Sequence, residues 1–324
     1  MEREVVEPVD VAHPDGRLRR EAVGWARHPL QRCNLAPGIS RAHAFNYWCI
    51  SDRSCALSVL VADIRVAGFA LVSFLDYTAR TPVECVTVRP FGLPERLPES
   101  PRGDIFFRSR RLELALRAQG DDLHITASGR PLLGRRLEVD VVVERPRTHE
   151  TVNVVVPWDD TRYHVTSKQQ ALPARGVVRI GGRERRLVDA YACLDFGRGR
   201  WPKGIEWCWA FASGRHGGHT LGLNLCARWT DDTGVTENGV IIDGRLHKIA
   251  DVVDITPGDF WRIRTRTGDR VDLRFTPIHR RKVRLPLGPV GMSLHQCVGT
   301  FSGSVLELPI HDLLGVAETF DGWW

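Results

Sequence analysis

Short apolar runs separated by glycine-containing turns recur along the whole of this 324-residue chain. The turn pairs Gly181-Gly182, Gly217-Gly218, Asp243-Gly244 and Gly268-Asp269 supply the positive φ angles that tight hairpins require. Long amphipathic helical periods are nearly absent. The sequence therefore predicts an all-β protein made of consecutive antiparallel hairpins, with little helix.

The predicted strands number eight before residue 150 and thirteen after it. They cover residues 44–51, 55–65, 67–77, 83–89, 104–108, 110–118, 122–128, 135–144, 151–157, 161–167, 175–181, 184–194, 205–213, 218–229, 236–242, 245–254, 259–266, 269–276, 278–285, 294–308 and 312–320.

A chain with so many short strands is expected to form closed or nearly closed sheets, because closure removes exposed edges. We expect two antiparallel barrels packed into one unit. The charged and proline-containing stretch Arg145-Pro146-Arg147 interrupts the strand pattern and marks a break between them. The expected organisation is an irregular segment over 1–42, an N-terminal barrel over 43–148 and a C-terminal barrel with the candidate pocket over 149–324.

Composition narrows the class of protein. Hydrophobic residues make up 43% and charged residues 26% of the chain, which is typical of a soluble globular protein. No run of about 18 apolar residues occurs, so we expect no membrane span. The polar, acidic start predicts no secretory signal, and the eight scattered cysteines are expected to be buried free thiols. These features favour a cytoplasmic location.

The net charge of +6 comes almost entirely from arginine, since only four of the 45 basic residues are lysines. Strand alternation puts Arg262, Arg264 and Arg266 on one surface. A nucleic-acid-binding stripe is one interpretation, but no binding motif accompanies it. We therefore expect a solvated outer face and no nucleic-acid partner.

Signatures of cofactor and metal sites are missing. The cluster from Gly197 to Pro202 fails the dinucleotide fingerprint because proline replaces its last glycine, and no P-loop is present. His216 and His219 flank a hairpin turn with no third ligand in sight. We expect neither a cofactor nor a metal.

Residues 189–248 are the richest in chemically useful side chains. Alternation places Trp207, Trp209 and Phe211 on one face of a strand. On the next strand, it places three leucines on one face and Asn224 on the other. Glu237 stands at the start of an otherwise apolar strand.

Two interpretations of this stretch compete. In the first, the tryptophans are core, Asp195 forms an ion pair with nearby arginines and Asn238 caps a turn. In the second, aromatic walls hold an apolar ligand at a barrel mouth and a few polar groups orient it. Polar side chains such as Asn224 and Glu237 inside a barrel need partners or a ligand, because burying them alone is costly.

A family resemblance extends over most of the chain. It rests on colinear segments: VGWARHPLQRCNL from Val23, FNYWCISD from Phe45, HVTSKQQALPARG from His164, LDFGRGRWP from Leu194, EWCWAFASG from Glu206, TENGVIIDG from Thr236, HQCVGTFSG from His295 and GVAE from Gly315. Together they closely resemble the bacterial domain-of-unknown-function family 2804.

More distantly, the run from LDFG to LGLNLCARW is similar to the carotenoid hydratase and AttH-like proteins. That resemblance implies tandem lipocalin-like barrels. Some proteins of that architecture are cofactor-free hydratases or pericyclic cyclases that act on apolar substrates. The residues it would carry over are Asp195, Trp207 and Trp209.

The favoured function is binding of a small apolar ligand: a lipid, a terpenoid or a polyketide-like molecule. The first alternative is a cofactor-independent hydratase, cyclase or isomerase, with Glu237 and Asp195 as catalytic candidates. The second alternative is a structural or interaction protein with filled barrels. Candidate ligand-binding residues are Trp207, Trp209, Asn224, Asn238, Arg198, Arg200 and His295. Ligand identity and oligomeric state stay open.

Overall fold

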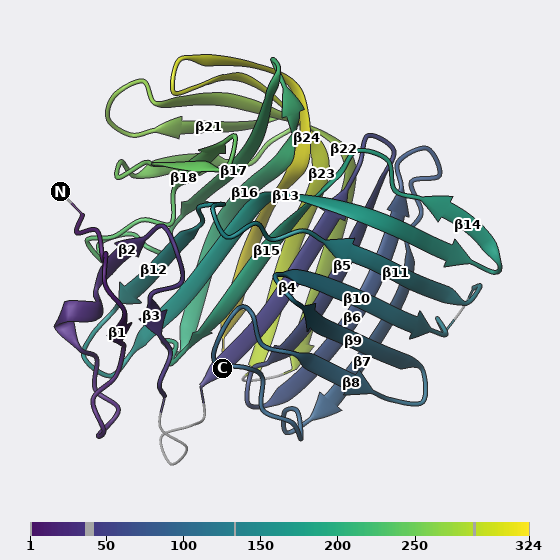
Figure 1. Ribbon diagram of the computed structural model, residues 1–324, viewed down its shortest axis with the longest axis horizontal. Helices are drawn as coiled ribbons and strands as arrows, with labels where there is room; N and C mark the ends of the chain where they lie inside the picture. Colours follow the sequence, from purple (N-terminus) through teal and green to yellow (C-terminus); the bar gives the residue numbers. More distant parts are fainter. Residues whose placement is uncertain (1, 36–41, 133, 288–289, 324) are drawn as a thin grey trace.

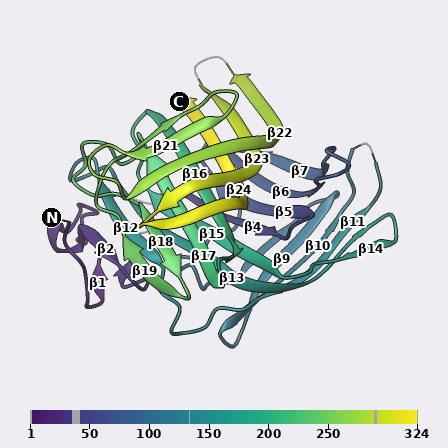
Figure 2. The same ribbon diagram turned by 90° about the horizontal axis from the view of Figure 1, so that it is seen from above.

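The computed structural model describes residues 2–35, 42–132, 134–287 and 290–323. Within these ranges the chain is almost entirely strand, and its one helical element is the short 3-10 turn η1 (Arg20–Ala22). The prediction of an all-β fold is confirmed. Figure 1 shows the strands gathered into two curled antiparallel sheets, and Figure 2 shows the same sheets from above.

The first sheet carries 13 strands in the described part of the chain. Its central path, in spatial order, is β7 (Val83–Pro90), β6 (Ala67–Asp76), β5 (Cys55–Asp63), β4 (His43–Ser51), β15 (Ala190–Gly199), β13 (Tyr163–Ile180), β11 (Leu137–Val143), β10 (Asp122–Gly129), β9 (Leu112–Gln119) and β8 (Ile105–Arg108). Off this path lie β12 (Val152–Pro157), β14 (Arg183–Arg186) and β2 (Gly24–Ala26).

The second sheet carries nine strands among the described residues. Their spatial order is β19 (Arg245–Lys248), β18 (Gly239–Ile242), β17 (His219–Ala227), β16 (Gly204–His216), β24 (Leu308–Trp323), β23 (Val290–Val305), β22 (Val271–Leu287), β21 (Trp261–Thr265) and β20 (Val253–Thr256). A separate parallel pair joins β1 (Val9–Asp10) to β3 (Gln31–Arg32).

The two edge strands of each sheet are consecutive in sequence. The connection between them keeps the two edges close together, so the sheet curls. β7 and β8 form the edges of the first sheet and β19 and β20 those of the second. Across the first gap, Cys85 Sγ donates to the Arg111 carbonyl over 3.2 Å, and Thr87 Oγ1 lies 3.2 Å from Ser109 Oγ. The result is two half-barrels, each with little exposed edge.

The hairpin turns confirm the role of the glycine pairs. Gly181 and Gly182 have φ of 56° and 83°, and Asp243 and Gly244 have φ of 49° and 80°. Both residues of a type I′ turn require positive φ, which explains this residue choice. Gly268 also has positive φ, but it lies within the longer loop between β21 and β22.

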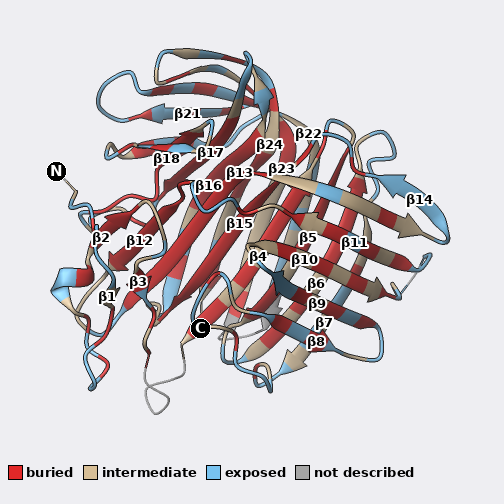
Figure 3. Cartoon of the chain, in the orientation of Figure 1, coloured by how far each residue is buried: buried red, intermediate tan, exposed pale blue. Residues whose placement is uncertain are grey.

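Three apolar clusters form the main core of the molecule, and one of them joins the two sheets. One cluster fills the first half-barrel and includes Trp48 and Leu194, and a second fills the other half-barrel and includes Leu223 and Phe275. A third cluster lies between the sheets, where Cys193 of β15 and Trp209 of β16 both belong to it. Figure 3 shows this buried region running along β12, β13, β15 and β16.

The change from one sheet to the other falls between Gly199 and Gly204. The sequence analysis placed it at 148/149, but β12 to β15 belong to the first sheet. The residues 2–35 hold the short strands β1 to β3 and pack over β12 and β13 through a small cluster that includes Val11 and Val165.

Other expectations concern single residue types. All eight cysteines are buried and free, as their scattered spacing predicts. Arg262 and Arg264 are exposed on β21, between buried neighbours. In the described part of the chain, no helix is long and apolar enough to cross a bilayer.

Candidate functional site

A buried lysine links a carboxylate of the first sheet to a carboxylate in the loop before β18. Lys168 Nζ of β13 lies 2.7 Å from Asp195 Oδ2 and 3.4 Å from Glu237 Oε2. The three side chains are only 7%, 10% and 1% exposed, respectively. Lys168 also lies 4.5 Å from the centre of the Trp209 ring, in a cation–π arrangement.

The register of β13 and β15 explains how Lys168 meets Asp195. The two residues are direct cross-strand partners, so both side chains leave the same face of the sheet. Gly197 follows on that face, where an added Cβ would lie 2.3 Å from Phe45 and 2.6 Å from His164. The sequence analysis left residues 195–204 between two predicted strands. Residues up to Gly199 belong to strand β15. The missing side chain of Gly197 leaves room for the two rings to pack against this strand.

Hydrogen bonds made by Asn224 of the second sheet fix the position of the Trp209 ring. Trp209 Nε1 donates to Asn224 Oδ1 at 2.9 Å, and Gln170 Nε2 of β13 donates to the same oxygen at 3.1 Å. Asn224 Nδ2 donates to the Glu237 carbonyl at 2.7 Å. Asn224 therefore ties both sheets to the segment that carries Glu237.

Glu237 is held from both sides by its neighbours in sequence. Thr236 Oγ1 donates to the Ile249 carbonyl at 2.7 Å. Asn238 Oδ1 accepts from the Cys226 backbone N–H at 2.7 Å, and its Nδ2 donates to the Asp251 carbonyl at 3.1 Å. Because both neighbours are pinned to backbone, the segment before β18 is fixed with the Glu237 side chain turned inward.

A third carboxyl, Glu318 of β24, lies on the same face of the second sheet. It is the cross-strand partner of Trp209. Trp207 Nε1 donates to Glu318 Oε1 at 3.0 Å, and Gln296 Nε2 donates to Oε2 at 2.8 Å. Trp207 in turn stacks on Phe320 with ring centres 3.9 Å apart.

Burial raises the pKa of Asp195, Glu237 and Glu318, because charged carboxylates lose their hydration there. The Lys168 ammonium opposes this shift in the pKa of Asp195 and Glu237. The pKa of Lys168 itself is raised: burial lowers it, but the two carboxylates more than compensate. With one cation among three buried carboxyls, burial favours the protonated form of these groups.

Several polar atoms around Lys168 are buried without a hydrogen-bond partner among the described residues. They are Asp195 Oδ1, both Glu237 carboxylate oxygens, Thr166 Oγ1 and Gln170 Oε1. Thr166 is two residues before Lys168 on the same strand and so shares its face. Each buried polar group without a partner calls for an explanation, and a catalytic role is one such explanation.

Trp229, in the loop after β17, is the centre of an aromatic group beside these carboxyls. Its ring lies 4.7 Å from Trp158, 5.2 Å from His164, 5.6 Å from Trp201 and 5.8 Å from Trp207. Burial holds the pKa of His164 well below its usual value, and its Nδ1 accepts a hydrogen bond from Trp201 Nε1 at 2.9 Å. This ring is therefore neutral.

The structure brings together Asp195, Glu237, Trp209 and Asn224, with Trp207 joined to them through Glu318. They lie between the sheets, on the outer face of the second half-barrel, whereas the sequence analysis expected a barrel mouth. The inner face carries Leu221, Leu223 and Leu225 instead.

The remaining predicted residues lie elsewhere. Arg198 is on the opposite face of β15, where its guanidinium donates to the Leu97 carbonyl at 2.6 Å. Arg200 is half-buried just after β15, and its backbone N–H donates to the Tyr163 carbonyl at 2.9 Å. His295 is on the other face of β23 from Gln296, 3.4 Å from Cys297 Sγ and 5.7 Å from the Trp261 ring centre. The expected Asp195–arginine ion pair is thus replaced by Asp195–Lys168.

Sequence reasoning missed Lys168, Glu318 and Trp229. A signal for Lys168 existed: it is one of four lysines, and it stands in the HVTSKQQALPARG segment. In the portion of the chain that the structure describes, no group of three or more histidine, cysteine or acidic side chains could hold a metal ion.

Comparison with solved structures defines the class of fold. A putative AttH from Nitrosomonas europaea has a TM-score of 0.55 and 10% identity, over 86% of this chain and 91% of that chain. Kievitone hydratase from Nectria haematococca has a TM-score of 0.54 and 10% identity, over 87% and 88%. CghA has a TM-score of 0.53 and 13% identity, over 87% and 88%. At such identities the likeness is one of fold, and the chain is a tandem lipocalin-like protein.

The amino-acid sequence assigns the chain to a particular family. The model of the family described as "Domain of unknown function (DUF2804)" matches residues 2–324, so the chain belongs to that family. No curated protein matches it.

Proposed function

We propose that this protein is a cofactor-independent enzyme that transfers protons to and from a small, largely apolar molecule bound between its two sheets. The observation that carries the proposal is the Lys168–Asp195–Glu237 cluster, where one buried ammonium is shared by a carboxyl of the first sheet and a carboxyl of the loop before β18. Strongly perturbed carboxyls with unsatisfied oxygens are the groups that general acid–base catalysis uses.

Glu237 is the general acid in this proposal. Burial raises its pKa, which favours the protonated acid that this role requires. Transfer of that proton to one carbon of a substrate double bond leaves a cation on the other carbon. The faces of Trp209 and Trp229 would stabilise this cation. Water then adds to it and returns a proton to the Glu237 carboxylate, or loss of a neighbouring proton to Glu237 gives an isomer.

Asp195 and Lys168 act together in this scheme. Lys168 stays charged because the Asp195 carboxylate, 2.7 Å away, raises its pKa. It therefore stabilises the Glu237 carboxylate once the proton has left. The half-buried rings of Trp201, Trp207 and Phe320 pack against the inter-sheet apolar cluster, and in this proposal an apolar substrate enters beside them. The hydratase among the similar folds is in keeping with this reaction class, although fold alone does not determine chemistry.

The test is incorporation of solvent deuterium. The protein is incubated in heavy water with small terpenoid and polyketide-like alkenes and enones, and recovered molecules are analysed by mass spectrometry. We expect carbon-bound deuterium in one or more of them, and loss of at least about 100-fold of the rate in Glu237→Gln.

Glu206→Gln is the matched control, because Glu206 is exposed on the opposite face of the same sheet and pairs with Arg228. It should keep the full rate. An unchanged rate in Glu237→Gln would remove Glu237 from the mechanism. Retention of a panel molecule without any label would support binding and contradict catalysis.

A further inference from the structure

An exposed apolar face lies on the outside of the first half-barrel, along the edge where β7 approaches β8. Ten large apolar side chains are exposed among the described residues, and half of them gather here. They are Val66 at 48%, Val86 at 48%, Val88 at 54%, Phe91 at 92% and Phe106 at 52% exposed. Single apolar side chains are ordinary at a surface, but a gathering of this kind is typical of a contact site for an apolar partner.

Strand alternation explains why these side chains share one face. Val86 and Val88 alternate with side chains that point into the first half-barrel, so they point outward. The two turns at the end of this face are joined, because the Phe91 backbone N–H donates to the Val66 carbonyl at 3.0 Å. Phe106 is likewise exposed between two buried neighbours on β8, the edge strand opposite β7.

The same side of the sheet leads to the Lys168–Asp195–Glu237 cluster. Successive cross-strand partners on β15, β4, β5, β6 and β7 are Asp195, Tyr47, Leu60, Leu71 and Val86. Cross-strand partners project from the same side of a sheet, so these five side chains form one row. Four strand spacings make the row roughly 19 Å long. Exposure rises from 7% at Asp195, through three half-buried residues, to 48% at Val86.

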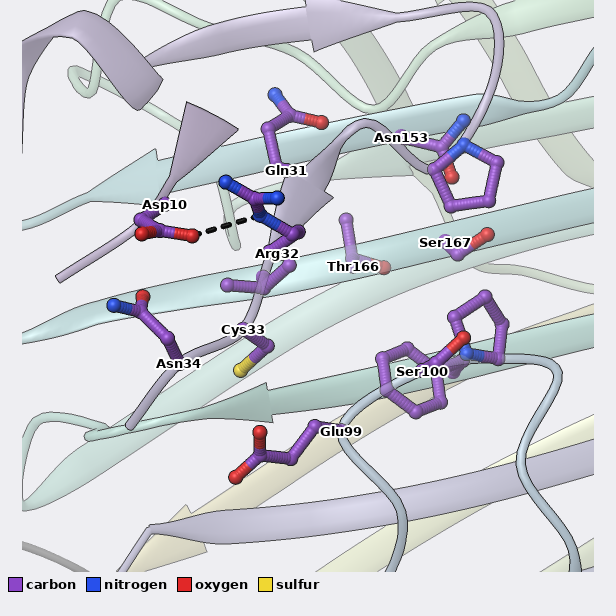
Figure 4. Close-up of a pocket in the computed structure, with 14 residues that line it drawn as sticks. Asp10, Gln31, Arg32, Cys33, Asn34, Glu99, Ser100, Asn153, Thr166 and Ser167 are labelled. Carbon is purple, nitrogen blue, oxygen red and sulfur yellow. Dashed lines mark hydrogen bonds and ion pairs between the residues drawn. The ribbon is translucent and has the colours of Figure 1, made fainter. Parts of the chain in front are cut away.

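The cavity beside the N-terminal segment is a poorer entrance for an apolar molecule. It has a volume of about 320 Å³, and most of its lining residues are polar. Figure 4 shows these side chains around the space, with Asp10 accepting a hydrogen bond from Arg32 at 2.8 Å. Phe196, which lines the cavity, adjoins Asp195 along β15, so its side chain leaves the opposite side of the sheet. The outer row is therefore the apolar approach to the cluster.

Exposed arginines border the apolar face. Arg65 directly precedes Val66, and the Arg117 guanidinium lies 5.1 Å from the centre of the Phe106 ring. Neither arginine has an ion-pair partner among the described residues. The nearby Asp63 carboxylate is occupied by two backbone N–H groups, at 2.8 and 3.1 Å. Apolar side chains bordered by guanidinium groups match the interface of a bilayer that carries anionic headgroups.

We propose that this face docks the protein on the surface of a lipid bilayer. The choice of a bilayer rests on the proposed function, because an apolar substrate partitions into lipid and the row leads from the face to Asp195. A second copy of the chain fits the face less well. A two-fold contact pairs a patch with itself, so Arg65 and Arg117 of both copies would border one interface and repel each other.

Flotation with lipid vesicles tests the docking. The purified protein is mixed with vesicles of phosphatidylcholine alone, or of phosphatidylcholine with about one-third phosphatidylglycerol. We expect binding to the anionic vesicles and weaker binding to the neutral ones. Phe91→Asn should weaken binding to the anionic vesicles at least about ten-fold, because it removes the most exposed apolar side chain of the face. Asparagine tolerates the positive φ of 66° at this position.

Phe260→Asn is the matched control. Phe260 is also exposed, but it lies between β20 and β21 of the second sheet, so this variant should bind within about two-fold of wild type. Arg117→Gln should weaken binding to the anionic vesicles about five-fold and leave binding to the neutral vesicles unchanged. Val88→Thr keeps the side-chain shape at a strand position, which strands tolerate well. It should also weaken binding, which guards against misfolding of Phe91→Asn.

The proposal is wrong if the wild-type protein floats with neither kind of vesicle, or if Phe91→Asn and Phe260→Asn bind equally well. It is also wrong if size-exclusion chromatography shows a dimer that Phe91→Asn converts into a monomer. Glu237→Gln should bind vesicles as the wild type does. Vesicle binding without deuterium incorporation would therefore reject the proposed reaction and keep the docking, and incorporation without vesicle binding would do the reverse.

Discussion

Lys168 is costly to bury and is retained only because its partners are close. A buried ammonium loses several kcal/mol of hydration, and nearby carboxylates return most of that when the geometry is good. Here Asp195 is in hydrogen-bond range and Glu237 is slightly farther away. The ion pair thus specifies how the sheets meet rather than adding much net stability.

Removing only the ammonium tests this balance. Lys168→Met leaves two buried carboxyls without their cation and should cost about 3–5 kcal/mol of unfolding free energy. Urea denaturation at neutral pH measures it, and Lys203→Met, at an exposed position, should change stability by less than about 0.5 kcal/mol. The triple variant Lys168→Met, Asp195→Asn, Glu237→Gln should recover much of the loss. Full stability in Lys168→Met alone would contradict the assigned role of the ion pair.

The raised pKa of Glu237 also predicts a pH dependence. A carboxyl whose pKa is higher in the folded state than in the unfolded state stabilises the fold at low pH. That contribution is lost as the pH rises from the ordinary glutamate value of about 4.3 through the raised folded value. Glu237→Gln cannot ionise, so its stability relative to wild type should increase with pH over this window. Denaturation curves at a series of pH values measure the difference, and a difference that falls with rising pH would refute the shift.

Side-chain alternation predicted correctly that Trp207, Trp209 and Phe211 share a face, because the period of a strand is fixed. It could not predict which face points into a half-barrel. Both faces of β16 and β17 are apolar, so hydrophobic pattern does not distinguish inside from outside. Lys168 was missed because its partner Asp195 is defined by the register between β13 and β15, which no local pattern encodes.

At the scale of elements, the predicted strands differ from the observed strands at bulges and at glycines. The predicted strands 161–167 and 175–181 are one strand, β13, with a register shift between Gln169 and Leu172. In the same way, 269–276 and 278–285 form β22, with a shift between Pro277 and His279. Polar or proline residues at a bulge look like a strand end in sequence, although the backbone continues through it.

Gly197 of β15 is required by the aromatic packing above it. Gly197→Ala would force its Cβ into Phe45 and His164, and we expect a loss of about 1–3 kcal/mol in unfolding free energy. Gly204→Ala is the control, because its Cβ would meet one backbone oxygen at 3.9 Å, and it should cost less than about 1 kcal/mol. Thermal and urea unfolding of both variants measure the comparison. Equal stabilities would show that the rings move aside freely.

At the scale of the whole molecule, two half-barrels meet by their outer faces, and the acidic cluster lies in that contact. Two barrel-like sheets could be predicted from strand number and turn spacing. The position of the change between sheets could not, because the β12–β15 region pairs back onto β4 and that pairing is long-range in sequence. The site consequently draws on residues from both halves, which is why a search within residues 189–248 found only part of it.

The central claim is that this inter-sheet cluster keeps a proton on a buried carboxyl at neutral pH. Infrared spectroscopy in ordinary and heavy water measures it directly through the carbonyl stretch of a protonated carboxyl group. We predict such a band, shifted by deuteration, in the wild-type protein at neutral pH. It should be weakened in Glu237→Gln and retained in Glu206→Gln. A wild-type spectrum without the band, or a band unchanged in Glu237→Gln and also in Glu318→Gln and Asp195→Asn, would contradict the claim.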